Sequence, residues 1–237
     1  VSLGIISVFI LVAYFAFSFA RKAEQDQVWV GMAKETAHQL GTPLSSLIAW
    51  IEYLRLKNVD SATLDDMAKD VSRLETITER FSKIGSVPDL VPERIVAVLD
   101  ESIDYMRTRS SKKVQFTFES NNLEELTVPI NVPLFAWVVE NLCRNAIDAM
   151  EGTGAIHVEL TEQNSDITID VSDTGKGIAR SKFETVFQPG YTSKKRGWGL
   201  GLSLTKRIVE QYHSGKIVVK QSEIDKGTTF RITLNKA

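Results

Sequence analysis

The chain has 237 residues, 28 Lys and Arg against 30 Asp and Glu, a net charge of −2 and 43% apolar residues. This composition is ordinary for a folded protein and gives no reason to expect disorder or bulk nucleic-acid binding. A single cysteine, Cys143, excludes a disulfide scaffold within the chain. The length is enough for roughly one or two domains.

Residues 1–20 carry no charged side chain, and sixteen of the twenty are apolar. About 20 helical residues cross a hydrocarbon core about 30 Å thick, so this segment predicts a transmembrane helix. One alternative is a signal peptide, since residues 18–20 resemble a cleavage site, but no basic region precedes the apolar run. Another is a buried soluble helix, which is rarely apolar on every side. Arg21 and Lys22 favour a cytoplasmic location for residues from about 21 onward. The missing initial Met predicts a fragment.

Residues 21–87 predict a helical hairpin. Residues 57–61 interrupt the apolar pattern, and Asp60 or Ser61 can cap a second helix. Helices joined by so short a loop are antiparallel, and a lone hairpin cannot bury both apolar seams. We therefore expect a homodimer that forms a four-helix bundle. The seams, spaced alternately by three and four residues, are Ala37, Leu40, Leu44, Leu47, Ile51 and Leu54, then Leu64, Met67, Val71, Leu74 and Phe81, with Thr78 interrupting the second.

His38 follows the seam residue Ala37 by one position, about 100° round the helix, so it should face outward. Thr42 lies one turn later on the same face. Pro43 has no N–H and frees the carbonyl of Gln39, which should loosen the helix beside His38. Taken alone, this pattern also fits a surface histidine near a helix kink.

Residues 88–237 follow a proline-containing boundary and predict a separate domain with an α+β fold. We expect hairpin-like strand pairs, with helices covering one face of the sheet, in a sandwich. Helical patterns cover residues 94–109 and 134–150, and strand patterns cover residues 114–118, 155–161, 166–173, 216–221 and 228–234.

Three clusters in this domain can carry chemistry. Asn141 and Asn145 lie four apart on one helix face, and amide oxygens suit Mg²⁺. Asp173 begins a D-x-G-x-G turn, where a carboxylate can accept a hydrogen bond from a base amine and glycines let the backbone approach the ring. The glycines of residues 197–201 precede a helix start near residue 202, which favours phosphate. Each cluster alone is weak evidence, because such patterns also occur as solvated amides and turns.

Together, the order and spacing of these elements resemble the sensor histidine kinases of two-component systems, which are bacterial proteins of the inner (cytoplasmic) membrane. Their ATP domain belongs to the gyrase/Hsp90/MutL superfamily. The resemblance covers about residues 21–237. The matching motifs are an H box at residues 38–43, an N box at 141–145, a G1 box at 173–177, an F box at 183–187, a G2 box at 197–201 and a terminal Gly-Thr element at 227–230.

The resemblance implies an ATP and Mg²⁺ site. Asp173 would hold the adenine, Asn145 would ligate Mg²⁺, and Asn141 would help position the phosphates. Residues 188–198 would form a lid. The further cofactor-binding residues implied by the resemblance are Gly175, Gly177, Lys194, Gly197, Gly199, Leu200, Gly201 and Thr228.

The resemblance also implies that His38 takes the γ-phosphoryl group and passes it to an aspartate of a response regulator, with Thr42 supporting phosphatase activity toward that regulator. In relatives the residue after the histidine is commonly an acid that accepts the ring proton, whereas here it is Gln39, whose amide can only orient the ring. Glu35, one turn earlier, is the nearest acidic substitute. We therefore expect Glu35 or water to accept the proton.

Two other functions stay open on the sequence. A hydrolysing ATPase of this superfamily would carry a glutamate at the position of Asn141, with Glu140 adjacent here. A scaffold that binds ATP without phosphoryl transfer is kept open by Gln39. His157 and His213 are expected to be structural, with His213 near a helix end that favours a cation. Cys143 is expected to pack in the core.

Overall fold

The computed structural model describes residues 2–57, 60–83, 88–163, 165–193 and 199–236. Within the first two helices, the side chains of residues 2–8, 18–30, 32–34, 36, 73, 77 and 79–83 lie outside the described part. The chain divides into two compact units, Val1–Val87 and Pro88–Ala237. The division falls at the first of the two prolines of the boundary segment.

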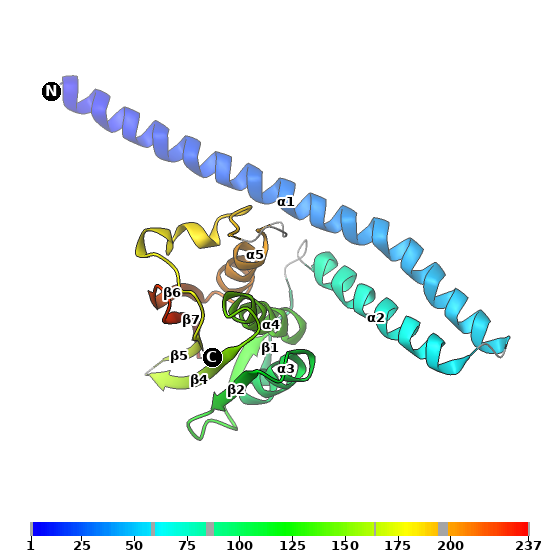
Figure 1. Ribbon diagram of the computed structural model, residues 1–237. Helices are drawn as coiled ribbons and strands as arrows, with labels where there is room; N and C mark the ends of the chain where they lie inside the picture. The colour runs from blue at the N-terminus through cyan, green and yellow to red at the C-terminus, as the bar shows by residue number, and fades with distance from the viewer. Residues whose placement is uncertain (1, 58–59, 84–87, 164, 194–198, 237) are drawn as a thin grey trace. The chain divides into compact units, whose positions relative to one another are not determined.

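The first unit is a hairpin of α1 (Ser2–Leu56) and α2 (Ser61–Lys83), which run antiparallel (Figure 1). Although Pro43 lies within α1, the helix continues through it. Asp60 caps α2, because its carboxylate accepts the backbone N–H of Thr63 at 3.0 Å and the hydroxyl of Thr63 at 2.6 Å. The predicted hairpin and its cap at Asp60 are confirmed.

The hairpin buries only alternate members of the predicted apolar seams. Those buried between the helices are Ala37, Leu44 and Ile51 on α1 with Leu64 and Val71 on α2. The seam residues that alternate with these buried ones in the sequence keep 42% to 50% of their surface exposed; they are Leu40, Leu47, Met67 and Leu74. Phe81 lies outside the described side chains. One hairpin thus leaves half of its apolar seam without cover.

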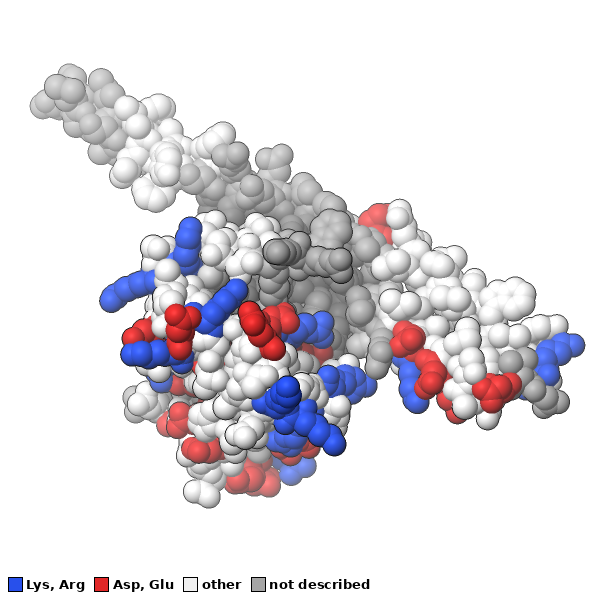
Figure 2. Space-filling model, viewed as in Figure 1, with Lys and Arg blue, Asp and Glu red and all other residues white. Residues whose placement is uncertain are grey.

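The predicted transmembrane segment falls on the start of α1. Its described side chains are those of residues 9–17, and all of them are exposed and uncharged (Figure 2). Among the residues that the structure describes, no helix combines the length and the apolar character needed to cross a membrane.

The second unit contains a five-stranded sheet in the order β2-β4-β5-β7-β6. Strand β2 is parallel to β4, and the remaining pairs are antiparallel. The strands are β2 (Val114–Glu119), β4 (Gly154–Gln163), β5 (Asp166–Asp173), β6 (Lys216–Glu223) and β7 (Gly227–Asn235). The expected α+β fold is confirmed, with each strand within a few residues of its predicted bounds.

Helices cover one face of this sheet (Figure 1). They are α3 (Ile95–Arg109), α4 (Val132–Ala149) and α5 (Gly201–Arg207), and α5 continues into the π-helical turn η3 (Ile208–Tyr212). Two 3₁₀ turns, η1 (Arg180–Lys182) and η2 (Thr185–Phe187), precede α5. Acidic and basic side chains are interspersed on the face of this unit drawn in Figure 2.

Alternation along β5 sets which side chains reach the helices. Ile167, Ile169 and Val171 are buried beneath the helices, and Asp173 shares their face because successive residues of a strand point to opposite sides. Asp170 points to the other face, where Arg231 and Lys220 bind its carboxylate at 2.7 Å. The sheet therefore presents Asp173 toward the helices.

A second, two-stranded sheet was not predicted. It pairs β1 (Val91–Arg94) with β3 (Thr127–Ile130), and Pro92 lies opposite Pro129. Proline cannot donate to a strand ladder, so both segments look like breaks in sequence. The helix expected from Arg94 accordingly begins one residue later.

Candidate functional site

Asp173 ends β5 and is 9% exposed. Its Oδ1 accepts the backbone N–H of Gly175 at 2.7 Å, and the backbone N–H of Thr228 also bonds to its carboxylate. Burial raises the pKa of the Asp173 carboxyl above its usual value, although these two N–H groups act in the opposite direction. A carboxylate held in this way keeps acceptor capacity for a further donor.

The loop after Asp173 leaves no room for side chains at its two glycines. A Cβ at Gly175 would lie 2.8 Å from Ala149 of α4, and a Cβ at Gly177, whose φ is +71°, would lie 2.1 Å from the carbonyl oxygen of Glu223. Lys176 donates its backbone N–H to the carbonyl of Ala149 at 3.1 Å. This loop is thus seated between the end of α4 and the end of β6.

One face of α4 connects this loop to the start of α5. Asn141, Asn145 and Ala149 form a row with a spacing of four residues, about 12 Å long at 1.5 Å per residue. Asn141 donates Nδ2–H to the hydroxyl of Thr205 at 2.7 Å, and a Cβ at Gly201 would lie 2.7 Å from the Oδ1 of Asn141. Asn145 therefore lies midway between the start of α5 and the loop after Asp173.

The predicted glycine-rich turn is described in part. Gly201 is the first residue of α5 and Leu200 occupies its N-cap position, close to the predicted start near residue 202. Gly199 has a φ of +65°, and a Cβ there would lie 2.5 Å from the carbonyl carbon of Gly190. Lys194 and Gly197, with the rest of residues 194–198, lie outside the described residues.

Thr228 completes the surroundings of Asp173. The two residues are partners in the β5–β7 register, and the hydroxyl of Thr228 pairs with that of Ser222 at 2.9 Å. Sequence reasoning did not single out Ser222, because a lone serine near the end of a strand gives no signal of its own.

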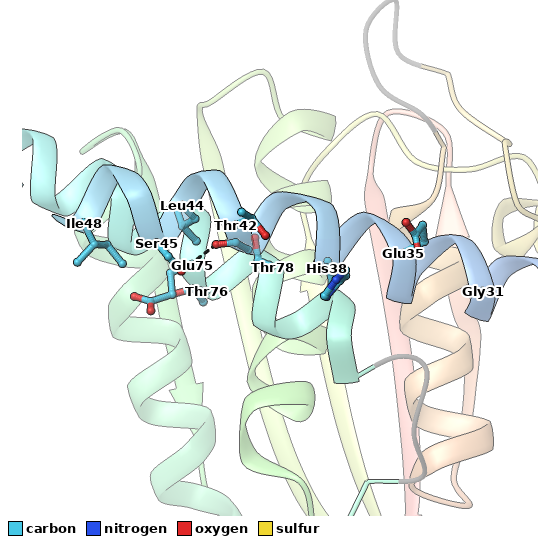
Figure 3. A pocket seen from close by; sticks show the side chains of 12 residues that line it. Gly31, Glu35, His38, Thr42, Leu44, Ser45, Ile48, Glu75, Thr76 and Thr78 are labelled. Atoms are coloured by element: carbon cyan, nitrogen blue, oxygen red, sulfur yellow. Dashed lines mark hydrogen bonds between the residues drawn. The ribbon is translucent and has the colours of Figure 1, made fainter. Parts of the chain in front are cut away.

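The second cluster of interest lies on the hairpin. His38 is exposed while Ala37 is 5% exposed, so the predicted outward direction is confirmed. His38 lines an open groove of about 800 Å³ between α1 and α2, together with Glu35 and Thr42 (Figure 3). Glu75 of α2 lines the same groove and was not predicted, since its helix lies apart from His38 in sequence.

Within this cluster, the side-chain amide of Gln39 is hydrogen-bonded to Glu35. Its Nε2–H donates to Oε1 of Glu35 at 2.7 Å, one turn back along α1. Gln39, which occupies the position of the missing acid, is therefore bonded to Glu35, the nearest acidic substitute.

The expectation that His213 favours a cation is wrong. His213 is 6% exposed, its Nε2 accepts the backbone N–H of Asn131 at 3.1 Å, and its Nδ1–H donates to the carbonyl of Ile208 at 2.8 Å. An acceptor Nε2 requires the neutral ring, and burial lowers the pKa of His213. Its expected structural role is confirmed, because it connects the start of α4 to η3.

Cys143 is fully buried on α4, and burial raises the pKa of its thiol to about 12, as expected of a packing residue. Phe187 packs edge-on against Phe230 with ring centroids 6.1 Å apart. His157 lies in β4 and bonds to the hydroxyl of Thr117 at 2.8 Å. These side chains have structural roles.

Comparisons with known proteins agree with this geometry. Residues 131–237 match the model of the histidine kinase-, DNA gyrase B-, and HSP90-like ATPase family. The sensor histidine kinase ZraS of Salmonella typhimurium is 30% identical over 224 residues, which cover 91% of this chain and 48% of ZraS. The chain thus spans about half the length of this relative.

Two solved structures are also similar. The catalytic domain of histidine kinase ThkA has 27% identity and a TM-score of 0.57, over 63% of this chain and 97% of that domain. The same kinase in complex with its response regulator protein TrrA has the fold in common, at 24% identity and a TM-score of 0.57, over 87% of this chain and 61% of that one. Residues 131–237 therefore belong to the histidine kinase-, DNA gyrase B- and HSP90-like ATPase family, and the chain that carries them is a homologue of sensor histidine kinases.

Proposed function

We propose that this chain is the kinase core of a two-component sensor, which transfers the γ-phosphoryl group of ATP to His38 and from there to an aspartate of a response regulator. The observation that carries the proposal is the presence in one chain of two components. One is an exposed histidine beside Thr42 on a hairpin groove. The other is a cradle around Asp173 within a domain of this ATPase family.

The cradle suits a purine nucleotide. The carboxylate of Asp173 can accept a hydrogen bond from the exocyclic amine of adenine, and the loop backbone at Gly175 and Gly177 would lie close to the ring. Phosphates would extend along the α4 row toward the start of α5, whose first backbone N–H groups have no acceptor within the helix. Mg²⁺ bound through the amide oxygen of Asn145, water and phosphate oxygens would neutralise phosphate charge.

The transfer itself needs a neutral imidazole. A ring nitrogen of His38 attacks the γ-phosphorus, an N–P bond forms, and the O–P bond to ADP breaks, so that ADP leaves. The ring proton then passes to Glu35 or to water. Because the protein does little covalent chemistry beyond this, positioning and electrostatics supply the acceleration.

The experiment that tests this function follows the γ-phosphate of labelled Mg·ATP. We expect label to become bound to the protein, and to be reduced in Asp173→Asn, which lacks the charged acceptor for the adenine amine. Release of free phosphate with an unlabelled protein would instead show the hydrolysing ATPase. ATP binding with neither labelled protein nor released phosphate would indicate a scaffold that binds ATP without phosphoryl transfer.

The complex of ThkA with its response regulator protein TrrA supports a response regulator as partner, because this chain shares the fold of ThkA. Thr42 lies one turn after His38 and lines the same groove, so it can orient water at a docked regulator. We expect Thr42→Ala to retain labelling of His38 but to lose dephosphorylation of the regulator. Decay of regulator phosphate at the parent rate would refute this role.

The exposed half of the apolar seam supports a homodimeric four-helix bundle. A second hairpin would cover Leu47 and Met67, which are 42% and 43% exposed. The double variant Leu47→Glu/Met67→Glu should be monomeric by light scattering in detergent. The control Leu56→Glu, at an 81% exposed position outside the seam, should stay dimeric. A parent that is monomeric, or a dimeric double variant, would contradict the bundle.

The apolar segment of residues 1–20 supports anchoring in the inner (cytoplasmic) membrane, with residues from about 21 onward in the cytoplasm. We expect the parent to stay in the membrane fraction after alkaline extraction. Val12→Lys/Phe15→Lys should release it, because each lysine at a span centre costs about 2.5–3.5 kcal/mol. Leu56→Lys should remain bound. A parent found in the supernatant would rule out the anchor.

A further inference from the structure

The hydroxyl of Ser222, near the end of β6, joins three polar groups. Its Oγ accepts the backbone N–H of Ile178 at 2.7 Å, lies 2.9 Å from the carbonyl oxygen of Gly227, and lies 2.9 Å from the hydroxyl oxygen of Thr228. These groups come from the loop after Asp173 and from the start of β7.

The direction of each bond follows from hydroxyl chemistry. A serine hydroxyl has one donor and two acceptor sites. The carbonyl of Gly227 can only accept, so it takes the Ser222 proton, and the N–H of Ile178 occupies one acceptor site. Thr228 must then donate to the other site, so the hydrogen-bonding capacity of Ser222 is fully used.

A β-bulge directs Ser222 toward this position. Val219 pairs with Phe230, but Gln221 pairs with Thr229, so Lys220 is an extra residue in β6. Without the bulge, Ser222 would point away from the buried face that Val219 shares, because sides alternate along a strand. With it, Ser222 pairs with Thr228 on the face where Asp173 lies.

The two segments that Ser222 joins are those that hold Asp173. Ile178 directly follows Gly177 of the loop, and the backbone N–H of Thr228 bonds to the carboxylate of Asp173. Gly227 lies so close that a Cβ there would be 1.8 Å from the carbonyl oxygen of Asp173. Any movement of this end of β7 would therefore move the Thr228 N–H group that donates to the Asp173 carboxylate.

We propose that Ser222 is a positioning residue for base recognition, which fixes the loop after Asp173 and the start of β7 so that the Asp173 carboxylate meets the exocyclic amine of a purine. This inference rests on the proposed function, since it assigns a role at the same nucleotide site. Ser222 acts through Asp173 and Thr228 and does not itself contact the base.

The test compares the affinity of the full chain for ATP with that for ITP, which has a carbonyl oxygen in place of the amine. A displaced Asp173 carboxylate should weaken only the hydrogen bond to the amine. Ser222→Ala should therefore lower the ratio of ATP affinity to ITP affinity about tenfold. The affinity for ITP should change little. Ser222→Thr, which keeps the hydroxyl, should retain the preference of the parent.

Ser172→Ala is the matched control. Ser172 also pairs its hydroxyl with a threonine, Thr229, at 2.9 Å, but on the opposite face of the sheet. It should keep the parent preference. Thermal unfolding of each variant measures stability separately, and a purely structural serine would lower the melting temperature without changing the preference.

A preference within twofold of the parent in Ser222→Ala would overturn the inference. Should that variant fail to fold, Ser222→Val against Ser222→Thr decides, because the two side chains have similar shape and differ in the hydroxyl. A parent that binds ATP and ITP equally, or neither, would remove the proposed function and this inference together. A parent that prefers ATP, with a Ser222→Ala variant whose preference stays within twofold of the parent's, removes the inference alone.

Discussion

At the residue scale, β5 carries two buried carboxylates with opposite characters. Asp170 is also desolvated, but hydrogen bonds from Arg231 and Lys220 outweigh its burial and lower its pKa. Asp173 has only backbone N–H partners, and burial raises its pKa. Asp170 thus stabilises the fold when ionised, while ionised Asp173 opposes it. A carboxylate kept in place against stability indicates a binding role.

The carboxylate of Asp173 should be required for nucleotide affinity. Asp173→Asn removes the charged acceptor of the adenine amine, so calorimetry should show ATP affinity reduced at least about tenfold. In the parent, affinity should fall as the pH drops through the raised pKa of Asp173, that is, at a higher pH than for an ordinary carboxyl group. Asp170→Asn should retain ATP affinity and lower the melting temperature. Equal affinity in Asp173→Asn and the parent would be inconsistent with this role.

Glu35 should accelerate labelling of His38. Both residues line one groove, and Gln39 holds the Glu35 carboxylate at 2.7 Å. Because a positioned base contributes about 10²-fold or more, Glu35→Ala should slow labelling by about that factor. Glu52→Ala, at an exposed position of α1 outside the groove, is the control. Labelling of Glu35→Ala at the parent rate would leave water as the proton acceptor.

At the element scale, α4 organises the second unit. Its start is capped by Asn131, whose Oδ1 accepts the N–H of Leu134 at 3.3 Å. The backbone N–H of Asn131 bonds in turn to His213, at the end of η3. Its middle contacts α5 through Asn141, and its end contacts the loop after Asp173 through Ala149. Movement of α4 would therefore reach both the start of α5 and the loop after Asp173.

The burial of His213 makes the stability of this unit depend on pH. The pKa of His213 is lowered in the folded state, so the unfolded chain binds the proton more tightly. The contribution is complete above the unfolded pKa of about 6.5 and is lost as the pH falls through the folded value. The melting temperature should drop on acidification in the parent and in His157→Gln, and drop less in His213→Gln. The same pH dependence in all three would contradict this.

Much of this element order was readable in the sequence because its patterns are strong. The run from Asp166 to Asp173 has the bounds predicted for it, and Asp60 caps α2 as expected. Prolines at 92 and 129 concealed β1 and β3, since propensity cannot show that two proline-containing strands pair. The role of Ser222 was equally hidden, because it depends on a bulge and on a contact with Ile178, which lies 44 residues away in the sequence and beyond the reach of any local pattern.

At the scale of the whole molecule, the two units divide the proposed reaction between them. The hairpin carries the acceptor, His38, on an open groove, and the unit from Pro88 to Ala237 carries the nucleotide cradle. Neither unit alone contains both components in the described residues. The exposed seam of the hairpin and the apolar residues 9–17 are two further exposed surfaces, for which we propose a second copy of the chain and a lipid bilayer as partners.

The most direct test of the central claim is to locate the phosphoryl group after incubation of the full chain with γ-labelled Mg·ATP. We expect an alkali-stable label in the peptide that contains His38, absent from His38→Ala and retained at the parent level in His157→Ala. Undiminished label in His38→Ala, or label confined to a different peptide of the parent, would contradict it.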